Sequence, residues 1–375
     1  MLRRPAPPGP PRRDSSDGAV GSWATLPKAM PEPFTVDARV RMWDAALGAV
    51  RKTLGRLGYR EVTTPTRQRV PIPEPYIEPL PAPPGYLVTS PEQGLKRLLG
   101  AGAGPIFEVA RVFRAGERGD RHREEFHLVE WYRPGGALVD LQAEVVELAG
   151  HVFEAVAPTV AEAGRTPPPV PRAPVRRVDV LDALARAVGA PLRGNESAAD
   201  LVAVVRRGRA DLRAAVEGAV SGFASLTAPG ADLAAWTALF SWWADGTLEG
   251  SAPPRGVVHL VRFPGQLAAL ARTEWVQDRY VAHRFETAVD GVEIANGYDE
   301  ERSADALGAR FEAVHGLRAA LDLPPLPPAD EVARAVAGIG PTVGVAFGLD
   351  RAIMLAAGTG SLDEVGLHVV ASPPS

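Results

Sequence analysis

The segment RFETAVDGVEIANGYDEE, residues 284–301, constrains the fold more than any other stretch of the chain. At its centre, an Asp-Gly dipeptide (290–291) separates two β-prone runs, and this dipeptide favours a two-residue hairpin turn. Such a turn pairs Ala288 with Glu293 across an antiparallel hairpin. Because side chains alternate along a strand, Glu286 lies on the same face as Ala288. We therefore expect two carboxylates to point the same way as diagonal neighbours.

Glu286 and Glu293 on one face are suitable ligands for Mg²⁺, which prefers carboxylate oxygens. A solvated sheet face can carry the same residues, so the hairpin alone leaves a metal site and a plain surface equally open. Asn296 and Glu300 follow on the outgoing strand and at its end. The segment thus gathers polar side chains on a strand pair that a fold would normally use for its core.

Regular patterns elsewhere in the chain are segregated rather than alternating. Apolar residues at three- and four-residue spacing predict helices, and β-prone runs at 106–114 and 126–133 predict two more strands. The chain has 375 residues, of which 46% are hydrophobic, enough for a large core and for one or two domains. Segregated elements predict an α+β fold with a mostly antiparallel sheet flanked by helices.

The domain organisation follows from composition. Residues 1–33 are rich in Pro and Gly, which predicts a flexible arm ahead of one domain over 34–375. Within that domain, residues 165–255 are rich in Ala, Arg and Pro and contain helical stretches. We interpret this region as a variable helical insertion.

Composition also excludes several classes of function. The absence of cysteine removes disulfides, thiolate nucleophiles and Cys-based zinc sites. A net charge of −4 gives no sign of general binding to nucleic-acid polyanions. No apolar run reaches the ~18 residues of a membrane span, and the basic, Pro-rich start is not a secretory signal. We expect a soluble, cytoplasmic protein without membrane attachment.

The stretch ERGDRHREEFHLVEW, residues 117–131, places dense charge between the two predicted strands. Arg114 ends the first strand and His122 lies in the loop, and both side chains can bind phosphate oxygens. On the second strand, Glu130 and Tyr132 alternate with apolar residues and could form a pocket wall. A charged hairpin held by its own salt bridges would have the same composition.

The segment GVAFGLDRAIML, residues 344–355, predicts a strand of small residues that turns into an apolar helix. Arg351 falls near the junction, where the amides of a helix N-terminus already favour anions. Taken alone this is a weak signal, because a single Arg at a helix start is usually a surface residue.

Taken in order, these segments resemble the motifs of a class II aminoacyl-tRNA synthetase of the lysyl branch. EVTTP and its preceding helix resemble motif 1, FRAGERGDRHREEF resembles motif 2, and GVAFGLDR resembles motif 3. The similarity is closer to the elongation factor P–lysine ligases, which are truncated paralogues of lysyl-tRNA synthetase. It covers residues 36–365 and is weakest between 165 and 255.

The resemblance implies roles for matching residues. It implies ATP and Mg²⁺ as cofactors, and a reaction in which the amino acid's own carboxylate attacks the α-phosphorus, so that alignment and charge stabilisation suffice. The implied catalytic residues are Arg114, for the α-phosphate, and Arg351. The implied ATP ligands are Arg114, Glu117, His122, Phe126 and Arg351, with Glu286 and Glu293 holding Mg²⁺. The implied amino-acid ligands are Glu92 and Glu130 for the α-amino group and Asn296 and Glu300 for the distal ammonium, with Tyr132 lining the pocket.

Lysine or (R)-β-lysine is the substrate implied, and a lysine side chain of elongation factor P is the acceptor. Two separated groups of polar ligands suit a substrate with two ammonium groups. The resemblance places Ala295 between the two groups, where lysyl-tRNA synthetases typically have Gly and the ligases have Ala. We expect its methyl group to favour β-lysine over α-lysine by a modest factor.

The chain departs from the family pattern at three places. Ala115-Gly116 replaces Asn-Glu, so adenine recognition would depend on backbone contacts or on Glu117. The triplet at 93–95 is Gln-Gly-Leu instead of Tyr-His-Met, and His127 replaces Thr. An amino acid other than lysine, or another acceptor, therefore stays open.

Two other functions were weighed. A lysyl-tRNA synthetase needs an anticodon-binding domain, which an arm of ~33 residues cannot form, so tRNA is not the expected partner. A catalytically silent regulator has no chemical need for Arg114, Glu286, Glu293 and Arg351 together. We also expect a homodimer, because the apolar stripe on the first helix exceeds the needs of one core: Val40, Trp43, Leu47, Val50 and Leu54.

Overall fold

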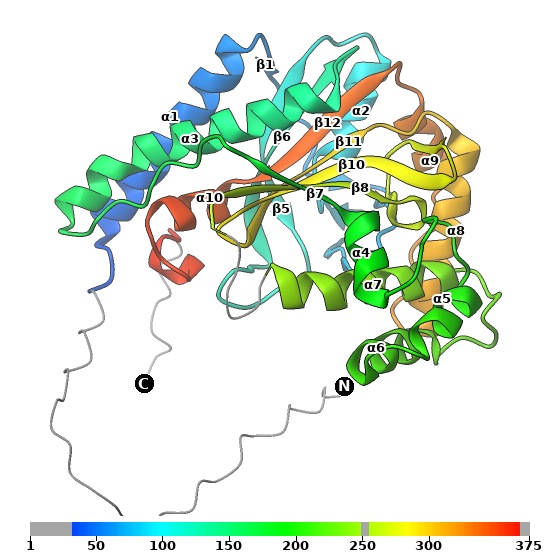
Figure 1. Cartoon of the computed structure of the whole chain (residues 1–375). Coiled ribbons are helices and arrows are strands. Elements are labelled where there is room, and N and C mark those ends of the chain that lie inside the picture. The colour runs from blue at the N-terminus through cyan, green and yellow to red at the C-terminus, as the bar shows by residue number, and fades with distance from the viewer. Residues whose placement is uncertain (1–31, 249–254, 368–375) are drawn as a thin grey trace, which may run out of the picture. The chain divides into compact units, whose positions relative to one another are not determined.

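The computed structural model describes residues 32–248 and 255–367 (Figure 1). The chain divides into two units, Met1–Pro33 and Phe34–Ser375. The predicted arm lies almost entirely outside the described residues. In the described part, no helix has the length and apolar character that crossing a membrane requires.

A nine-stranded mixed sheet forms the centre of the described residues, in the order β1-β5-β6-β12-β11-β10-β8-β7, with β9 paired to β10. Only the β1–β5 and β7–β8 pairs of this sheet are parallel, so the prediction of a mostly antiparallel sheet is confirmed. Its strands are β1 Arg60–Glu61, β5 Ile106–Phe113, β6 Glu125–Pro134, β7 Arg176–Asp179, β8 Val257–Pro264, β9 Thr273–Val276, β10 Arg279–Val289, β11 Val292–Asp299 and β12 Thr342–Gly348. A small second sheet contains β2 Arg67–Gln68, β3 Pro81–Ala82 and β4 Gly85–Leu87.

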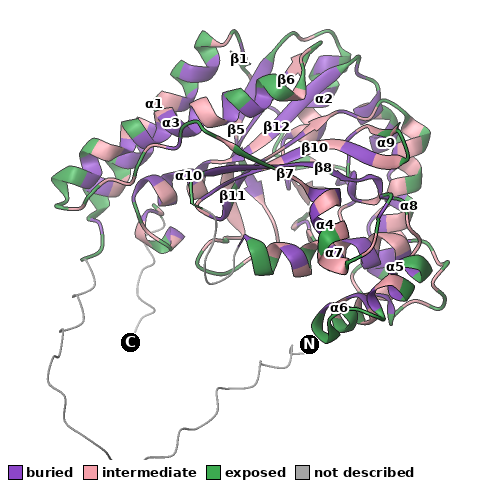
Figure 2. Ribbon diagram, viewed as in Figure 1, coloured by how far each residue is buried: buried purple, intermediate pink, exposed green. Residues whose placement is uncertain are grey.

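Helices cover both faces of the large sheet. The helices α1 (Val36–Arg56), α3 (Leu138–Glu162) and α10 (Leu349–Ala356) bury one face in a single hydrophobic core. The second core packs α4 (Val180–Val188), α5 (Ala198–Val205), α6 (Ala210–Val220) and α7 (Ala231–Thr247) against β8 and β10 on the other face. Figure 2 shows the central strands largely buried, with exposed outer surfaces on α1, α3 and α6. The remaining helices are α2 (Glu92–Gly100), α8 (Ala304–Ala320) and α9 (Asp330–Ala337).

The predicted hairpin is β10–β11, and its turn is of the expected kind. Ala288 pairs with Glu293, while Asp290 and Gly291 both have positive φ, 49° and 82°. Two central residues with positive φ define a type I′ turn, the geometry that matches the twist of a tight hairpin.

A β-bulge follows that turn and was not predicted. Thr287 pairs with Ala295 while Ala288 pairs with Glu293, so Ile294 is an extra residue on β11. Ile294 and Ala295 both pack in the core shared with α3. Because the bulge absorbs one residue, Glu293 and Asn296 lie on the same face of the sheet although they are three positions apart.

The apolar stripe of α1 is mostly used within the chain. Trp43, Val50 and Leu54 are buried in the core with α3, and the Trp43 indole donates a hydrogen bond to the carbonyl of Val365 at 2.9 Å. Val40 is 49% exposed. The reason given above for a homodimer, an excess of apolar surface on this helix, therefore reduces to a small exposed patch at its N-terminal end.

The region 165–255 is more than a helical insertion. Its described part contains α4–α7, as predicted, but it also contributes β7, which pairs in parallel with β8 and ends the large sheet. This strand is short and charged at 176–177, so its sequence has none of the alternation by which strands are predicted.

Candidate active site

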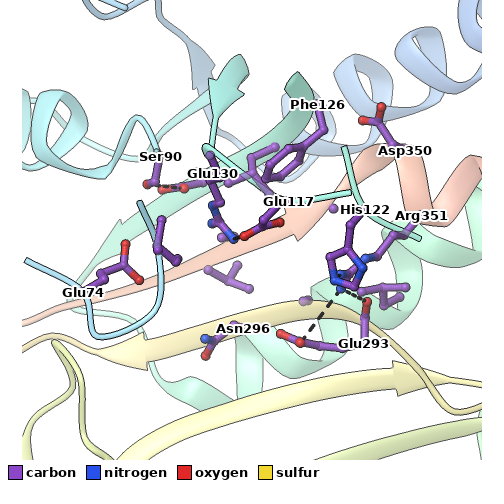
Figure 3. A pocket seen from close by; sticks show the side chains of 18 of the residues that line it. Glu74, Ser90, Glu117, His122, Phe126, Glu130, Glu293, Asn296, Asp350 and Arg351 are labelled. Carbon is purple, nitrogen blue, oxygen red and sulfur yellow. Dashed lines mark hydrogen bonds and ion pairs between the residues drawn. The ribbon is translucent and has the colours of Figure 1, made fainter. Parts of the chain in front are cut away.

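A cavity of about 340 Å³ lies on the face of β6, β12 and β11 opposite α3, bounded by the loop after β5 and by the start of α10 (Figure 3). Most of the predicted site residues line it: Arg114, Glu117, His122, Phe126, Glu130, Tyr132, Glu293, Ala295, Asn296, Glu300 and Arg351. Glu92 and Glu286 are not among the described residues that line it. The loop after β5, the strands β6 and β11, the segment that follows β11 and the helix α10 thus bring together residues far apart in the sequence.

One end of the cavity is cationic. The Arg114 guanidinium lies 5.1 Å from the centre of the Phe126 ring, and its Nε donates to the carbonyl of Thr89 at 3.3 Å. Arg351 donates to His122 Nε2 over 2.7 Å and to the carbonyl of Glu293 over 3.1 Å. Figure 3 shows His122, Arg351 and Phe126 together at this end. Two fixed guanidiniums and a flat ring suit a nucleotide with its phosphates.

The predicted magnesium ligands share a face, as the hairpin required. Glu286 accepts a hydrogen bond from Arg284, and its carboxyl is largely buried, while the Glu293 side chain is 47% exposed beside Arg351. Burial raises the pKa of Glu286 to about 7, Arg284 opposes this, and Glu293 adds to it. Two carboxylates that repel each other fit a Mg²⁺ ion whose remaining ligands come from phosphate and water. In the described residues no cluster of three such ligands forms.

The other end of the cavity is acidic and buried. Glu130 is 2% exposed and accepts hydrogen bonds from Ser90 Oγ at 2.5 Å and from the Tyr132 hydroxyl at 3.2 Å. Burial, and next the charge of Glu92, raise the pKa of Glu130 to about 8. Glu300 is fully buried, and its Oε1 has no hydrogen-bond partner. Such oxygens need a cation to offset the cost of their burial.

Lys96 corrects the predicted arrangement of these acids. Its buried ammonium lies 2.7 Å from Glu92 and 2.6 Å from Glu300. Burial disfavours the charge on Lys96, but Glu300 and Glu92 outweigh burial and raise its pKa. Glu92 and Glu300 therefore belong to one cluster around one nitrogen, and not to opposite ends of a pocket. Lys96 was missed because a lysine within KRLL has the sequence of a solvated helix face.

Gly344 of β12 allows this cluster to form. A Cβ atom at this position would lie 2.2 Å from the Tyr132 ring and 2.8 Å from Glu300 Oε1. Gly344 pairs with Tyr132 on one side and with Tyr298 on the other. The absence of a side chain therefore leaves the space in which Tyr132 and Glu300 approach each other.

Ala295 borders the cavity, but it is also part of the hydrophobic core, so its role in the choice of lysine isomer stays a prediction. Ala295 and Asn296 are neighbours on β11, so their side chains point to opposite faces, and Ala295 packs in the core. Ala346 of β12 pairs with both Glu130 and Asn296. Directly paired residues share a face, so Ala346 is the small residue that stands between the polar groups of the cavity.

Two of the departures from the family pattern lie outside the cavity. A Cβ at Gly94 would lie 2.5 Å from the side chain of Thr64, which binds Glu108 through its amide and hydroxyl. Leu95 is buried in a separate cluster. The backbone amide of His127 donates a hydrogen bond to the Asp350 carboxylate at 2.7 Å, and its ring packs edge-to-face with Trp43. Glu117 lines the cavity beside Arg114, and its contact with adenine stays a prediction.

Three further residues line or frame the cavity without having been predicted. Ser90 orients Glu130, and Glu74 comes from the Pro-rich loop before β3. Arg284 lies over the rings of Phe263 and Tyr298 and donates to the carbonyl of Leu267 at 2.8 Å. No local pattern marks them, because each acts through contacts with distant segments.

An antiparallel sheet that carries a cationic nucleotide end and a buried acidic end is the arrangement of a class II aminoacyl-tRNA synthetase catalytic domain. A family model described as tRNA synthetases class II (D, K and N) matches residues 35–370, and the chain belongs to this family.

Individual relatives are more specific. The chain is 32% identical to proteins named elongation factor P–(R)-β-lysine ligase from Pectobacterium carotovorum and Edwardsiella ictaluri, over 85% of this chain and 91% of each relative. It is 34% identical to the protein of that name from Haemophilus ducreyi, over 75% of both chains. The predicted resemblance to this group of ligases is confirmed.

Proposed function

We propose that this protein is an ATP-dependent ligase that adenylates (R)-β-lysine or lysine and transfers it to a lysine side chain of elongation factor P. The charge balance at the buried end carries the proposal. Glu92 and Glu300 share one internal cation, Lys96, and the buried carboxyl of Glu130 lies close enough to Glu92 for their charges to repel each other. The three carboxyl groups outnumber this one cation, which suits an amino acid with two ammonium groups that would keep the carboxylates ionised. The names of the relatives supply the acceptor.

The first step needs no side-chain nucleophile. The substrate carboxylate attacks the α-phosphorus of ATP, the bond to the β-phosphate oxygen breaks, and pyrophosphate leaves with the electron pair. Arg114 stabilises the charge on the α-phosphate, and Arg351 with His122 binds the outer phosphates. These contacts are strongest where charge develops, which lowers the barrier. When bound at Glu286 and Glu293, Mg²⁺ supplies further charge neutralisation.

We propose that Ala346, and not Ala295, is the residue that discriminates between the two lysine isomers. Its methyl group faces the space between Glu130 and Asn296, where an amino group displaced by one carbon would change position. We expect Ala346→Gly to shift the ratio of kcat/KM for the two isomers by a factor of ~10, and Ala295→Gly to shift it far less. Equal shifts in both variants would remove Ala346 from the specificity site.

The deciding experiment combines two assays. Pyrophosphate exchange with a panel of amino acids identifies the substrate, and mass spectrometry of elongation factor P and tRNA after incubation identifies the acceptor. The expected result is exchange with lysine isomers and a mass increase on the protein factor. Charged tRNA would contradict the acceptor, and absence of exchange with every amino acid would favour a silent regulator.

We also propose a homodimer in the cytoplasm, where a translation factor is available as acceptor. Val36 and Val40, 57% and 49% exposed, form the apolar patch on α1 that a partner could cover. Light scattering at micromolar concentration measures the mass directly, and a monomer would contradict the dimer.

A further inference from the structure

A second and larger cavity adjoins the active site. It has a volume of about 860 Å³ and lies between the Pro-rich loop before β3, the segment around α7, and α8. It shares Glu74, Asn296 and Tyr298 with the first cavity. In Figure 3, Glu74 and Asn296 lie at the opposite end from His122 and Arg351. The two cavities therefore meet at the end of the site opposite His122 and Arg351.

The walls of this second cavity are mainly apolar and its inner end is acidic. Leu226, Leu233 and Phe240 of the α7 segment line one side, and Pro73 lines another. Its two arginines are already engaged: Arg284 binds Glu286, and Arg310 binds Glu301 at 3.0 Å. The cavity thus offers apolar walls for a hydrocarbon stem and a carboxylate, Glu74, for a cationic tip.

Glu74 is unusual among the acids of the site. No described residue donates a hydrogen bond to its carboxylate or lies within ion-pair distance of it, and the carboxylate borders both cavities. Burial raises its pKa to about 7; Arg114 and Arg284 act against this, while Glu92 and Glu117 add to it. Arg318, which is buried, fixes the backbone of the loop by donating to the carbonyls of Glu74 and Ile77, each at 3.5 Å.

We propose that the second cavity admits the acceptor lysine and that Glu74 is the base that deprotonates it. This deepens the proposed function and rests on it, because an acceptor amine is required only if an adenylate forms. The four-carbon stem of a lysine on an extended protein loop would lie along the apolar walls. Its ammonium group would reach Glu74 beside Arg114, where the adenylate carbonyl is held.

The transfer step balances in protons and electrons. The acceptor ammonium gives one proton to the Glu74 carboxylate and becomes a neutral amine. The amine nitrogen attacks the carbonyl carbon of the adenylate, an amide bond forms, and the bond to the phosphate oxygen breaks. AMP leaves with that electron pair, and its phosphate takes the second proton of the attacking nitrogen. No oxidant, reductant or further reactant is needed.

The test separates the two half-reactions in Glu74→Gln, which keeps the size of the side chain and removes the base. Transfer from preformed adenylate to elongation factor P should fall at least ~100-fold more than pyrophosphate exchange. Hydroxylamine is mostly unprotonated at neutral pH, so its reaction with the adenylate should be similar in variant and wild type. Glu312→Gln is the matched control, because Glu312 is an exposed acid that lines the outer part of the same cavity.

A second variant tests the route independently of the base. Ala309 is an exposed residue of α8 that lines the cavity, so Ala309→Trp should obstruct a protein loop but not hydroxylamine. Equal loss of exchange and transfer in Glu74→Gln would overturn the proposal and make Glu74 a ligand of the amino acid. Unchanged transfer in both variants would also overturn it. Failure of exchange in the wild type would contradict the proposed function instead.

Discussion

Lys96 stabilises the amino-acid end of the cavity when no substrate is bound, because its ammonium offsets buried carboxylate charge. Its ammonium binds Glu92 and Glu300 inside the protein, so Lys96→Met leaves buried carboxylates without a cation. We expect the variant to lose about 3–5 kcal/mol of unfolding free energy, measured by urea denaturation. Added lysine or β-lysine should stabilise the variant more than the wild type, because the ligand supplies the missing charge.

Two matched variants control that result. Lys52→Met removes an exposed lysine of α1 and should change stability by less than ~0.5 kcal/mol. Adding Glu300→Gln to Lys96→Met should recover part of the loss, since one unpaired charge disappears with it. If the double variant is less stable than Lys96→Met alone, the charge pair is not the reason for the loss.

Arg114 and Arg351 act at the nucleotide end, and each contributes contacts that strengthen as phosphate charge develops. Replacing either by Ala should reduce pyrophosphate exchange by a factor that corresponds to ~2–4 kcal/mol, with an unchanged circular dichroism spectrum. Arg111→Ala is the control, because Arg111 is 59% exposed and pairs with Glu125 at 3.1 Å. Near-normal exchange in Arg114→Ala would exclude this residue from catalysis.

Gly344 of β12 leaves room for the side chains that form the amino-acid end of the cavity. In Gly344→Ala the new methyl group would overlap the Tyr132 ring and crowd Glu300, so the amino-acid end must change shape. We expect KM for the amino acid to rise by a factor that corresponds to ~1–3 kcal/mol, with little change in KM for ATP. Gly340→Ala is the control, since a Cβ there meets no atom within 4 Å. Parallel rises in both constants would contradict this local effect.

The β10–β11 hairpin separates what local sequence predicts from what it does not. The Asp-Gly turn fixed the pairing of Ala288 with Glu293, because turn geometry acts over two residues. The bulge at Ile294 was not predictable, since it depends on how β11 packs against α3 and pairs with β12. The bulge reverses the face of every later residue on β11 relative to a regular hairpin, so the faces of Ala295 and Asn296 do not follow from the turn alone.

At the scale of the whole molecule, segregated helices and strands were sufficient to predict the α+β class. The site was predictable where a motif lies within one segment, as for Arg114, His122 and Phe126. Lys96 and Glu74 were missed because Lys96 pairs with Glu300, and Glu74 shares a cavity with Asn296, in each case a residue more than 200 positions away. Whether a charged side chain is buried depends on how distant segments pack, so it cannot be predicted from the local sequence.

The buried acids should also make stability depend on pH. The pKa of Glu130 is raised to about 8 in the folded protein, against ~4.3 for an unfolded glutamate. The folded state therefore binds this proton more tightly, so the stabilisation is complete below pH ~4 and is lost as pH rises through about 8. Without ligand, the unfolding free energy should fall by ~2–3 kcal/mol between pH 6 and 8.5. Urea denaturation at both pH values measures this change.

Glu130→Gln should reduce the dependence of the unfolding free energy on pH, whereas Glu312→Gln should not. Saturating lysine should also reduce this dependence by keeping the Glu130 carboxylate ionised. A slope that is identical in Glu130→Gln and wild type would show that another group titrates.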